Sequence, residues 1–326
     1  MSEQETTEKH EANGNISIAF CFDNRVWMPV GVAVTSLLVN SKGKCHYDIY
    51  CVVPESVGID ARGQLKDLVS NLDDKSKISF IAPTKDYDDV TDVKYYGTAM
   101  FYRLLLHKLL PHLDKVIYYD HDVIFLKDLT ELWATPLDGK IAAACGGTTR
   151  IKPNFQIWRE SSFPQMVKER KCVTSGGLLL NLAEIRESGI EKEWLKYAKM
   201  KLIWPDQDIL NASLYGKVVY LPATFLFDQY SSLEYEVVKN MTVIHYFGGK
   251  PWLKGYVGGR SDLFFNIWWN HARMTPFFPA LWRDWLVNVG ITSFIKLPSW
   301  LLKFLSFFIF KKNKRESFLK NYVKPK

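Results

Sequence analysis

The first half of the chain alternates short apolar runs, typical of buried strands, with amphipathic segments of helical period. The predicted strands cover residues 16–22, 47–53, 78–81 and 115–119, and the predicted helices cover 30–39, 60–71, 100–110 and 128–133. Pro111 ends the third helix, and the spacing of Asp128 and Glu131 predicts a capping box for the fourth. This alternation predicts an α/β fold with a mostly parallel sheet and helices on both faces.

Two carboxylates follow the predicted strand at 115–119. Ligands of parallel sheets bind beyond the carboxyl ends of the strands, which is where Asp120 and Asp122 stand. Both can reach one hard divalent cation if the chain turns there, and burying them between apolar runs without a cation would be costly. The alternative is an Asp pair that caps a turn. Another acidic pair, at 86–88, lies in a polar loop that we expect to be solvated.

A third acidic pair stands at the start of a predicted helix. Pro205 suits the first helical turn, and Asp206 is a candidate N-cap. Asp208 fits a helix start as well as it fits a functional role. Gln207, between the two acids, can hydrogen-bond a sugar hydroxyl or a reacting centre.

Two glycine-bearing segments add candidate ligand contacts. Residues 174–177 are small and come immediately before a predicted strand, which lets the backbone approach a ligand closely. His245 ends another predicted strand and precedes a glycine turn that carries Lys250. A neutral imidazole can complete the coordination of a cation held by two carboxylates, and glycine amides with a lysine suit a phosphate. The alternative for His245 is a purely structural role.

Composition and missing motifs narrow the class of protein. The 326 residues, 47% of them hydrophobic, suffice for one large α/β domain or two smaller ones. The five cysteines show no C-x-x-C spacing, which excludes a disulfide scaffold or thiolate zinc finger and suits a reducing compartment. The polar, acidic start lacks a signal-peptide pattern, so we expect a cytoplasmic protein. The absence of Gly-rich dinucleotide, P-loop and nucleophile-elbow patterns argues against those enzyme classes.

The net charge of +7 is concentrated near the C-terminus. Residues 271–326 carry 11 Lys and Arg against two acids, whereas the first twelve residues have a net charge of −3. The rest is nearly neutral, which argues against nucleic acid as a partner. The run at 299–312, SWLLKFLSFFIFKK, is too short to span a bilayer and ends in a basic cluster, so it predicts a helix in an anionic membrane interface. The alternative is a helix packed on the protein's own core.

Four motifs, in order, resemble those of family 8 glycosyltransferases. They are YRLLLHKLLP, YYDHDVIFLKDLTELW, PDQDILN and HYFGGKPW, accompanied by AFCFDN and SGGLLLNL. The resemblance runs from about residue 16 to residue 252. These are retaining, metal-dependent enzymes that include bacterial lipopolysaccharide galactosyl- and glucosyltransferases and, more distantly, glycogenin. The basic aromatic tail is similar to the C-terminal extension of the lipopolysaccharide branch.

The resemblance implies a GT-A fold with a Rossmann-like sheet, a UDP-sugar donor and Mn²⁺ or Mg²⁺. It places a disordered acidic segment at 1–14, the catalytic domain at 15–270 and a helical membrane-associating extension at 271–326. The implied metal ligands are Asp120, Asp122 and His245. The implied donor-binding residues are Phe20, Asp23, Asn24, Arg103, His121, Thr174, Ser175, Gly176, Asp206, Gln207, Gly248 and Lys250. Of these, Arg103, Asp206 and Gln207 are expected to be catalytic, with Gln207 nearest the anomeric carbon.

The chain departs from the family pattern at two places. Thr174 stands where the family usually has Asn, and the strand after the metal motif ends in Gly146 and Gly147 where an Asp commonly follows. Both positions are expected to contact the donor sugar, so both bear on which sugar is used.

The function implied is transfer of a hexose, glucose or galactose, from a UDP-sugar to a lipid-linked saccharide such as a growing lipopolysaccharide core. The protein is then expected to be peripheral on the inner face of the cytoplasmic membrane. The alternative is a non-catalytic or altered module that binds a sugar nucleotide and docks on the membrane. A sugar nucleotidyltransferase would need a Gly-rich activating loop, which AFCFDNRVW lacks, and a phosphatase would need a nucleophilic Asp.

Overall fold

The structure, a computed structural model, describes residues 14–90, 97–147, 155–200, 202–228, 234–253 and 263–287. The chain divides into two compact units, Met1–His245 and Tyr246–Lys326. The catalytic-domain boundary expected at residue 270 stays a prediction.

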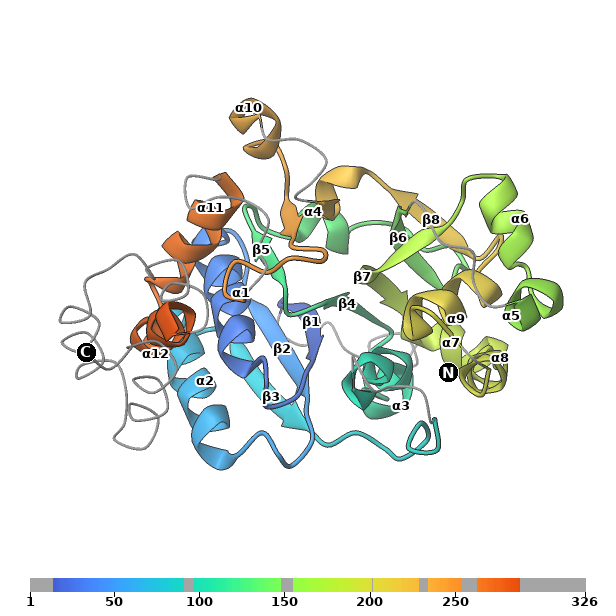
Figure 1. Cartoon of the computed structure of the whole chain (residues 1–326), viewed down its shortest axis with the longest axis horizontal. Coiled ribbons are helices and arrows are strands. Elements are labelled where there is room, and N and C mark those ends of the chain that lie inside the picture. Colours follow the sequence, from blue (N-terminus) through green and yellow to red (C-terminus); the bar gives the residue numbers. More distant parts are fainter. Residues whose placement is uncertain are drawn as a thin grey trace, which may run out of the picture. The chain divides into compact units, whose positions relative to one another are not determined.

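The apolar runs of the first unit form a seven-stranded sheet (Figure 1). Its strands are β1 (Ile16–Cys21), β2 (Tyr47–Val52), β3 (Lys77–Ile81), β4 (Lys115–Tyr119), β6 (Ala142–Gly146), β7 (Val173–Asn181) and β8 (Val218–Leu221). Their order is β3-β2-β1-β4-β7-β6-β8. Only β7 runs antiparallel to its neighbours in this sheet, so the prediction of a mostly parallel sheet is confirmed.

A small three-stranded sheet combines the strand that follows β4 with two strands from much later in the first unit. It consists of β5 (Val123–Phe125), β9 (Phe227–Asp228) and β10 (Val243–His245), in the order β5-β10-β9. Antiparallel pairing sets His245 of β10 opposite Val123, the residue that follows Asp122. The register therefore brings the end of β10 to the turn that joins β4 and β5.

Helices accompany the strands throughout the first unit (Figure 1). The α-helices are α1 (Trp27–Asn40), α2 (Ile59–Leu72), α3 (Leu106–Leu109), α4 (Thr130–Trp133), α5 (Phe155–Glu160), α6 (Phe163–Lys168), α7 (Leu182–Ser188), α8 (Glu191–Ala198), α9 (Pro205–Ser213) and α10 (Tyr235–Val238). Two 3₁₀-helices are η1 (Thr98–Leu105) and η2 (Ala223–Phe225). The main core joins apolar side chains of η1, β4, β7, α8 and α9, among them Phe101, Leu178 and Trp194.

Two helix predictions are corrected by the structure. The segment predicted as one α-helix at 100–110 is mainly the 3₁₀-helix η1, followed by the short α3. The Arg103 side chain donates through Nε to the Met100 carbonyl at 2.9 Å, a backbone acceptor within the same helix. The spacing of apolar residues in the sequence does not reveal this hydrogen bond. The capping box is absent: α4 begins at Thr130, and the Asp128 carboxylate accepts from the Thr130 backbone N–H at 3.1 Å and from Lys44.

Two loop predictions also change. The small residues 174–177 lie inside β7 rather than before it. Tyr87 lies between the two acids at 86 and 88, in a loop expected to be solvated. It is instead buried and stacks on Phe101 with ring centroids 5.0 Å apart. Its neighbour Asp86 pairs with Lys108 at 2.8 Å. An apolar partner elsewhere in the chain thus holds a loop that looks polar in sequence.

Aromatic side chains form the core of the second unit. Its helices are α11 (Leu263–Ala272) and α12 (Phe278–Trp285). Trp268 and Trp269 of α11 are buried, and Trp269 meets Trp282 of α12 edge-on at 5.1 Å between centroids. In the portion of the chain that the structure describes, no helix is long and apolar enough to cross a bilayer. The predicted interfacial helix at 299–312 lies outside the described residues.

Candidate active site

Asp120, Asp122 and His245 converge at the end of β4. Asp120 directly follows β4, Asp122 precedes β5, and His245 ends β10. One ligand atom from each residue lies within 4.8 Å of the other two, and His245 Nε2 is 3.5 Å from Asp122 Oδ1. Two carboxylates and an imidazole form a donor set that suits Mn²⁺ or Mg²⁺. Asp122 is only 5% exposed, so a cation here would offset its buried charge.

Gly176 of β7 forms one wall of this cluster. A Cβ atom built on it would lie 3.1 Å from Asp120 Oδ2 and 3.1 Å from His245 Cε1. Its carbonyl accepts from the Asp120 backbone N–H at 3.0 Å. A side chain at position 176 would therefore crowd both the carboxylate and the imidazole. The donor set of the three residues fits a bound cation.

Arg103 of η1 links the cluster to α9. Its Nη2 donates to Asp120 Oδ1 at 2.7 Å, and its Nη1 donates to the Ser175 carbonyl at 2.7 Å and lies 3.0 Å from Asp206 Oδ2. The side chain is 6% exposed, and its guanidinium stacks 4.5 Å from the centroid of the Tyr118 ring. Burial opposes its charge, but the two carboxylates raise the pKa of Arg103 above its ordinary value. Most of its N–H groups are thus directed at protein acceptors.

The start of α9 carries the sugar-site candidates. Gln207 Oε1 accepts from the Ser175 backbone N–H at 3.4 Å, and Asp206 is 8% exposed. Sequence reasoning missed Asn211, one turn further on, which is fully buried. Its amide oxygen accepts from the Val173 N–H at 2.8 Å, and its amide nitrogen donates to the Val173 carbonyl at 3.0 Å. Asn211 therefore fastens α9 to the start of β7.

Asp208 rather than Asp206 binds the backbone before α9. The helix has Pro205 in its first turn, as predicted, but no side-chain cap. Asp208 Oδ2 accepts from the backbone N–H groups of Ile203 and Trp204 at 2.9 and 3.2 Å. Burial raises the pKa of Asp208 to about 6, although the two hydrogen bonds lower it, and the nearby Asp206 carboxylate adds to the rise.

The end of β1 holds a charged pair. Asp23 binds Arg25 at 2.7 Å between Oδ2 and Nη2; burial favours a higher pKa for Asp23, but the Arg25 hydrogen bonds lower it below its ordinary value. Asn24 is exposed, whereas Phe20 is fully buried with its ring edge against Phe125. Any contact of Phe20 with a nucleotide would have to involve its backbone.

The two departures from the family pattern touch each other. A Cβ atom on Gly147 would lie 2.9 Å from Thr174 Cγ2 and 3.2 Å from the Thr174 backbone nitrogen. Thr174 Oγ1 is buried, and no hydrogen-bond partner for it occurs among the described residues. A side chain at position 147 would therefore crowd Thr174, so the two positions are sterically linked.

The remaining candidates are His121, between the two acids in sequence, and two residues that follow His245 along the chain. His121 is half-buried between the two acidic ligands. Gly248 and Lys250 belong to the second unit, three and five residues after His245. There Gly248 adopts a positive φ of 77°, and Lys250 Nζ donates to the Tyr246 carbonyl at 2.7 Å.

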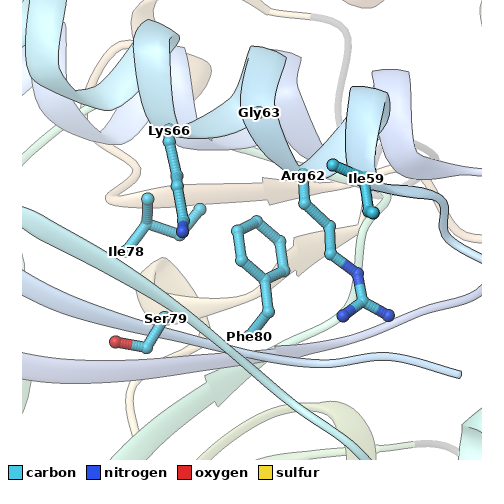
Figure 2. Close-up of a pocket in the computed structure, with 7 residues that line it drawn as sticks. All are labelled: Ile59, Arg62, Gly63, Lys66, Ile78, Ser79 and Phe80. Carbon is cyan, nitrogen blue, oxygen red and sulfur yellow. The ribbon is translucent and has the colours of Figure 1, made fainter. Parts of the chain in front are cut away.

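A surface pocket of about 500 Å³ lies between α2 and β3. Figure 2 shows Arg62 and Lys66 of α2 beside the Phe80 ring of β3, and their charged groups lie 5.9 and 6.0 Å from the ring centroid. These are cation–π distances, so packing of α2 on β3 explains why the two basic side chains line this pocket. None of its lining residues belongs to the site described above.

Comparison with solved structures defines the fold. The galactosyltransferase LgtC, solved with donor and acceptor sugar analogs, superimposes with a TM-score of 0.62 at 22% identity, over 83% of this chain and 100% of LgtC. The apo bifunctional glycosyltransferase WbbM gives a TM-score of 0.65 at 19% identity, over 85% of this chain and 52% of WbbM. The fold is thus a GT-A-like α/β fold.

Sequence comparison gives the family. The profile described as Glycosyl transferase family 8 matches residues 17–255, and the chain belongs to this family. The lipopolysaccharide 1,2-glucosyltransferase of Escherichia coli (strain K12) is 23% identical over 254 residues, 73% of each chain. The resemblance to family 8 and its lipopolysaccharide branch is confirmed.

Proposed function

We propose that the chain is a retaining, divalent-metal-dependent hexosyltransferase that uses a UDP-sugar, UDP-glucose or UDP-galactose. The observation that carries this proposal is the convergence of Asp120, Asp122 and His245 beside Gly176. The relative from Escherichia coli is named a lipopolysaccharide 1,2-glucosyltransferase, and LgtC is named a galactosyltransferase. These names support a lipid-linked saccharide acceptor of the lipopolysaccharide-core type.

The chemistry follows from the charges at the site. A divalent cation held by the cluster, Mn²⁺ or Mg²⁺, would neutralise charge on the diphosphate leaving group. Arg103 keeps Asp120 and Asp206 in place, and we expect Lys250 and Gly248 to bind the diphosphate. Asp23, Asn24 and the end of β1 would hold the uridine, and His121, Thr174 and Ser175 would line the donor site.

We favour front-face attack by the acceptor hydroxyl. The bond from the anomeric carbon to the UDP oxygen breaks, the acceptor oxygen bonds to the same face, and the hydroxyl proton passes to the leaving phosphate. Asp206 is ion-paired with Arg103, and Asp208 accepts two backbone N–H groups, so each carboxylate is already engaged. Gln207 lies beside Ser175, where its side chain can orient the sugar. A trapped glycosyl adduct on Asp206 or Asp208 would overturn this mechanism.

A thermal-shift screen of UDP-sugars, with and without Mn²⁺, tests the function. The true donor should give the largest metal-dependent rise in Tm and should then release UDP in the presence of an acceptor saccharide. Metal-dependent UDP-sugar binding without transfer to any lipid-linked saccharide would instead favour the non-catalytic membrane-docking module. Failure of Mn²⁺ to enhance UDP-sugar binding would contradict the metal-dependent transferase and would favour the non-catalytic module.

We also propose that the extension at 271–326 attaches the protein to anionic lipid on the inner face of the cytoplasmic membrane. Its charge of 11 Lys and Arg against two acids supports this. Deleting residues 291–326 should abolish sedimentation with phosphatidylglycerol vesicles while leaving UDP-sugar hydrolysis largely intact. Replacing only Lys311, Lys312, Lys314 and Arg315 by Gln should weaken sedimentation and its salt dependence. Unchanged sedimentation of the deletion variant would contradict the attachment.

A further inference from the structure

We propose that Tyr118 is a positioning residue of the metal site. Together with Arg103, its hydroxyl holds Oδ1 of Asp120 and leaves Oδ2 as the single ligand atom that Asp120 offers to the cation. The inference rests on the metal dependence of the proposed function and adds a residue that no motif assigned to the chemistry.

Two donors meet on one oxygen of Asp120. The Tyr118 hydroxyl donates to Oδ1 at 2.5 Å, and Arg103 Nη2 donates to the same atom at 2.7 Å. Each carboxylate oxygen has about two lone-pair directions, so these donors fill Oδ1. Both bonds are of the short, charge-assisted kind. The negative charge available to a cation is therefore directed to Oδ2.

The second oxygen points into the cluster. Oδ2 is the atom that a Cβ on Gly176 would approach at 3.1 Å, in the same space that the His245 ring borders. The geometry thus separates the carboxylate into a side held by protein donors and a side that faces the imidazole. A carboxylate fixed in this way binds in a monodentate manner, without reorientation when the ion arrives.

The strand geometry explains why Tyr118 rather than Tyr119 does this. Successive side chains of a strand point to opposite faces, so residues 118 and 120 share one face at the end of β4. Tyr119 points the other way, and its hydroxyl donates to the Phe225 carbonyl at 2.7 Å. Stacking of the Arg103 guanidinium 4.5 Å from the Tyr118 ring centroid holds both donors together.

The chain offers a matched control for the test. Tyr118 and Tyr119 are adjacent, both are fully or almost fully buried, and each donates one hydroxyl hydrogen bond. Tyr118→Phe and Tyr119→Phe each remove one such bond. Only the first of these bonds reaches a candidate metal ligand.

The experiment measures the Mn²⁺ dissociation constant of the full chain in excess UDP, by the electron paramagnetic resonance signal of free Mn²⁺. We expect Tyr118→Phe to weaken Mn²⁺ binding about tenfold, the lower end of the effect of removing an outer partner of a metal ligand. Tyr119→Phe should stay within about twofold of the wild type, although both variants lose similar stability in urea.

Wild-type Mn²⁺ affinity in a folded Tyr118→Phe protein would overturn the positioning role while leaving the transferase proposal intact. Failure of the wild type itself to bind Mn²⁺ would instead overturn the proposed function, and this inference with it. Gly176→Ala tests the assignment of Oδ2 independently if Tyr118→Phe does not fold. Its methyl group would crowd both Oδ2 and the His245 ring, so we expect at least tenfold weaker Mn²⁺ binding, and unchanged affinity would contradict a cation held between Oδ2 and the imidazole.

Discussion

Arg103 and Asp206 form an ion pair of 3.0 Å between Nη1 and Oδ2, and both side chains are largely buried. The pair joins η1 to the start of α9, so that one guanidinium contacts both the candidate metal site and the helix expected to hold the donor sugar. Its loss should affect folding and chemistry together.

Arg103→Lys should therefore destabilise the protein by about 3 kcal/mol, since a single ammonium group cannot reach all four acceptors and leaves buried carboxylates unpaired. Transfer activity should fall at least about a hundredfold, by analogy with removal of one charge-stabilising donor. Urea unfolding and a UDP-release assay measure the two effects. Arg25→Lys, at a pair whose arginine is 62% exposed, should change stability by less than about 0.5 kcal/mol. Equal effects of the two substitutions would contradict the linking role of Arg103.

Asp208→Asn should change how stability depends on pH. The folded-state pKa of about 6 lies above the ordinary 3.8, so the folded protein retains a proton that the unfolded chain loses between these values. This carboxyl group therefore lowers the free energy of unfolding as pH rises from about 4 to about 6, by about 3 kcal/mol in full. The asparagine does not titrate. The stability of the variant relative to wild type should increase over that pH range and then level off, as urea titrations at several pH values can check.

Asp122→Asn should remove most of the metal dependence. Replacing a carboxylate of the cluster by an amide takes away one negative charge where a hard cation prefers anionic oxygen. We expect the Mn²⁺-dependent rise in Tm with UDP to disappear and transfer to fall at least about a hundredfold. Wild-type enzyme treated with a chelator should lose activity and recover it with Mn²⁺. Transfer by the wild type that persists in the presence of a chelator would contradict the metal-dependent mechanism.

Gly147→Ala should be destabilising by about 1–3 kcal/mol, because the new methyl group overlaps Thr174 Cγ2. The adjacent Gly146→Ala is the matched control, since a Cβ there meets nothing within 4 Å. Thr174→Ser removes the crowding methyl group and should restore part of the loss in the double variant, although the backbone of residue 174 still stands close. Chemical denaturation of the wild type, Gly147→Ala, Thr174→Ser and the double variant gives the coupling energy between positions 147 and 174. Strictly additive losses would argue against a steric link.

Four strands in the first half of the chain were predictable because buried β-runs have a simple signature. The predicted strands at 16–22, 47–53, 78–81 and 115–119 each match an observed strand to within a residue at either end. The 3₁₀ form of η1 was not predictable, because apolar periodicity does not distinguish it from an α-helix and a buried guanidinium occupies one of its carbonyls. The burial of Tyr87 likewise depends on Phe101, which no local pattern reveals.

The site could be predicted in its charged residues and less so in their supports. The acids at 120 and 122 and the imidazole at 245 stand out by position in the sequence, and the structure brings them together. Tyr118 left a weak signal, since it shares the strand face of Asp120 two residues on. Asn211 ends the PDQDILN motif, but its role could not be predicted, because its partner Val173 is distant in sequence and is met only through the packing of α9 on β7.

The reversed direction of β7 has a consequence for how such a site can be remodelled. Because β7 is antiparallel to β4, its first residues rather than its last ones lie at the sheet edge where Asp120 stands, with Gly177 opposite Tyr119. A single inserted or deleted amino acid upstream of Val173 that shifted this pairing would exchange the two faces of the strand at once. Changes in the length of the loop before Val173 would therefore alter which side chains of β7 face Asp120 all at once, whereas a point substitution alters one.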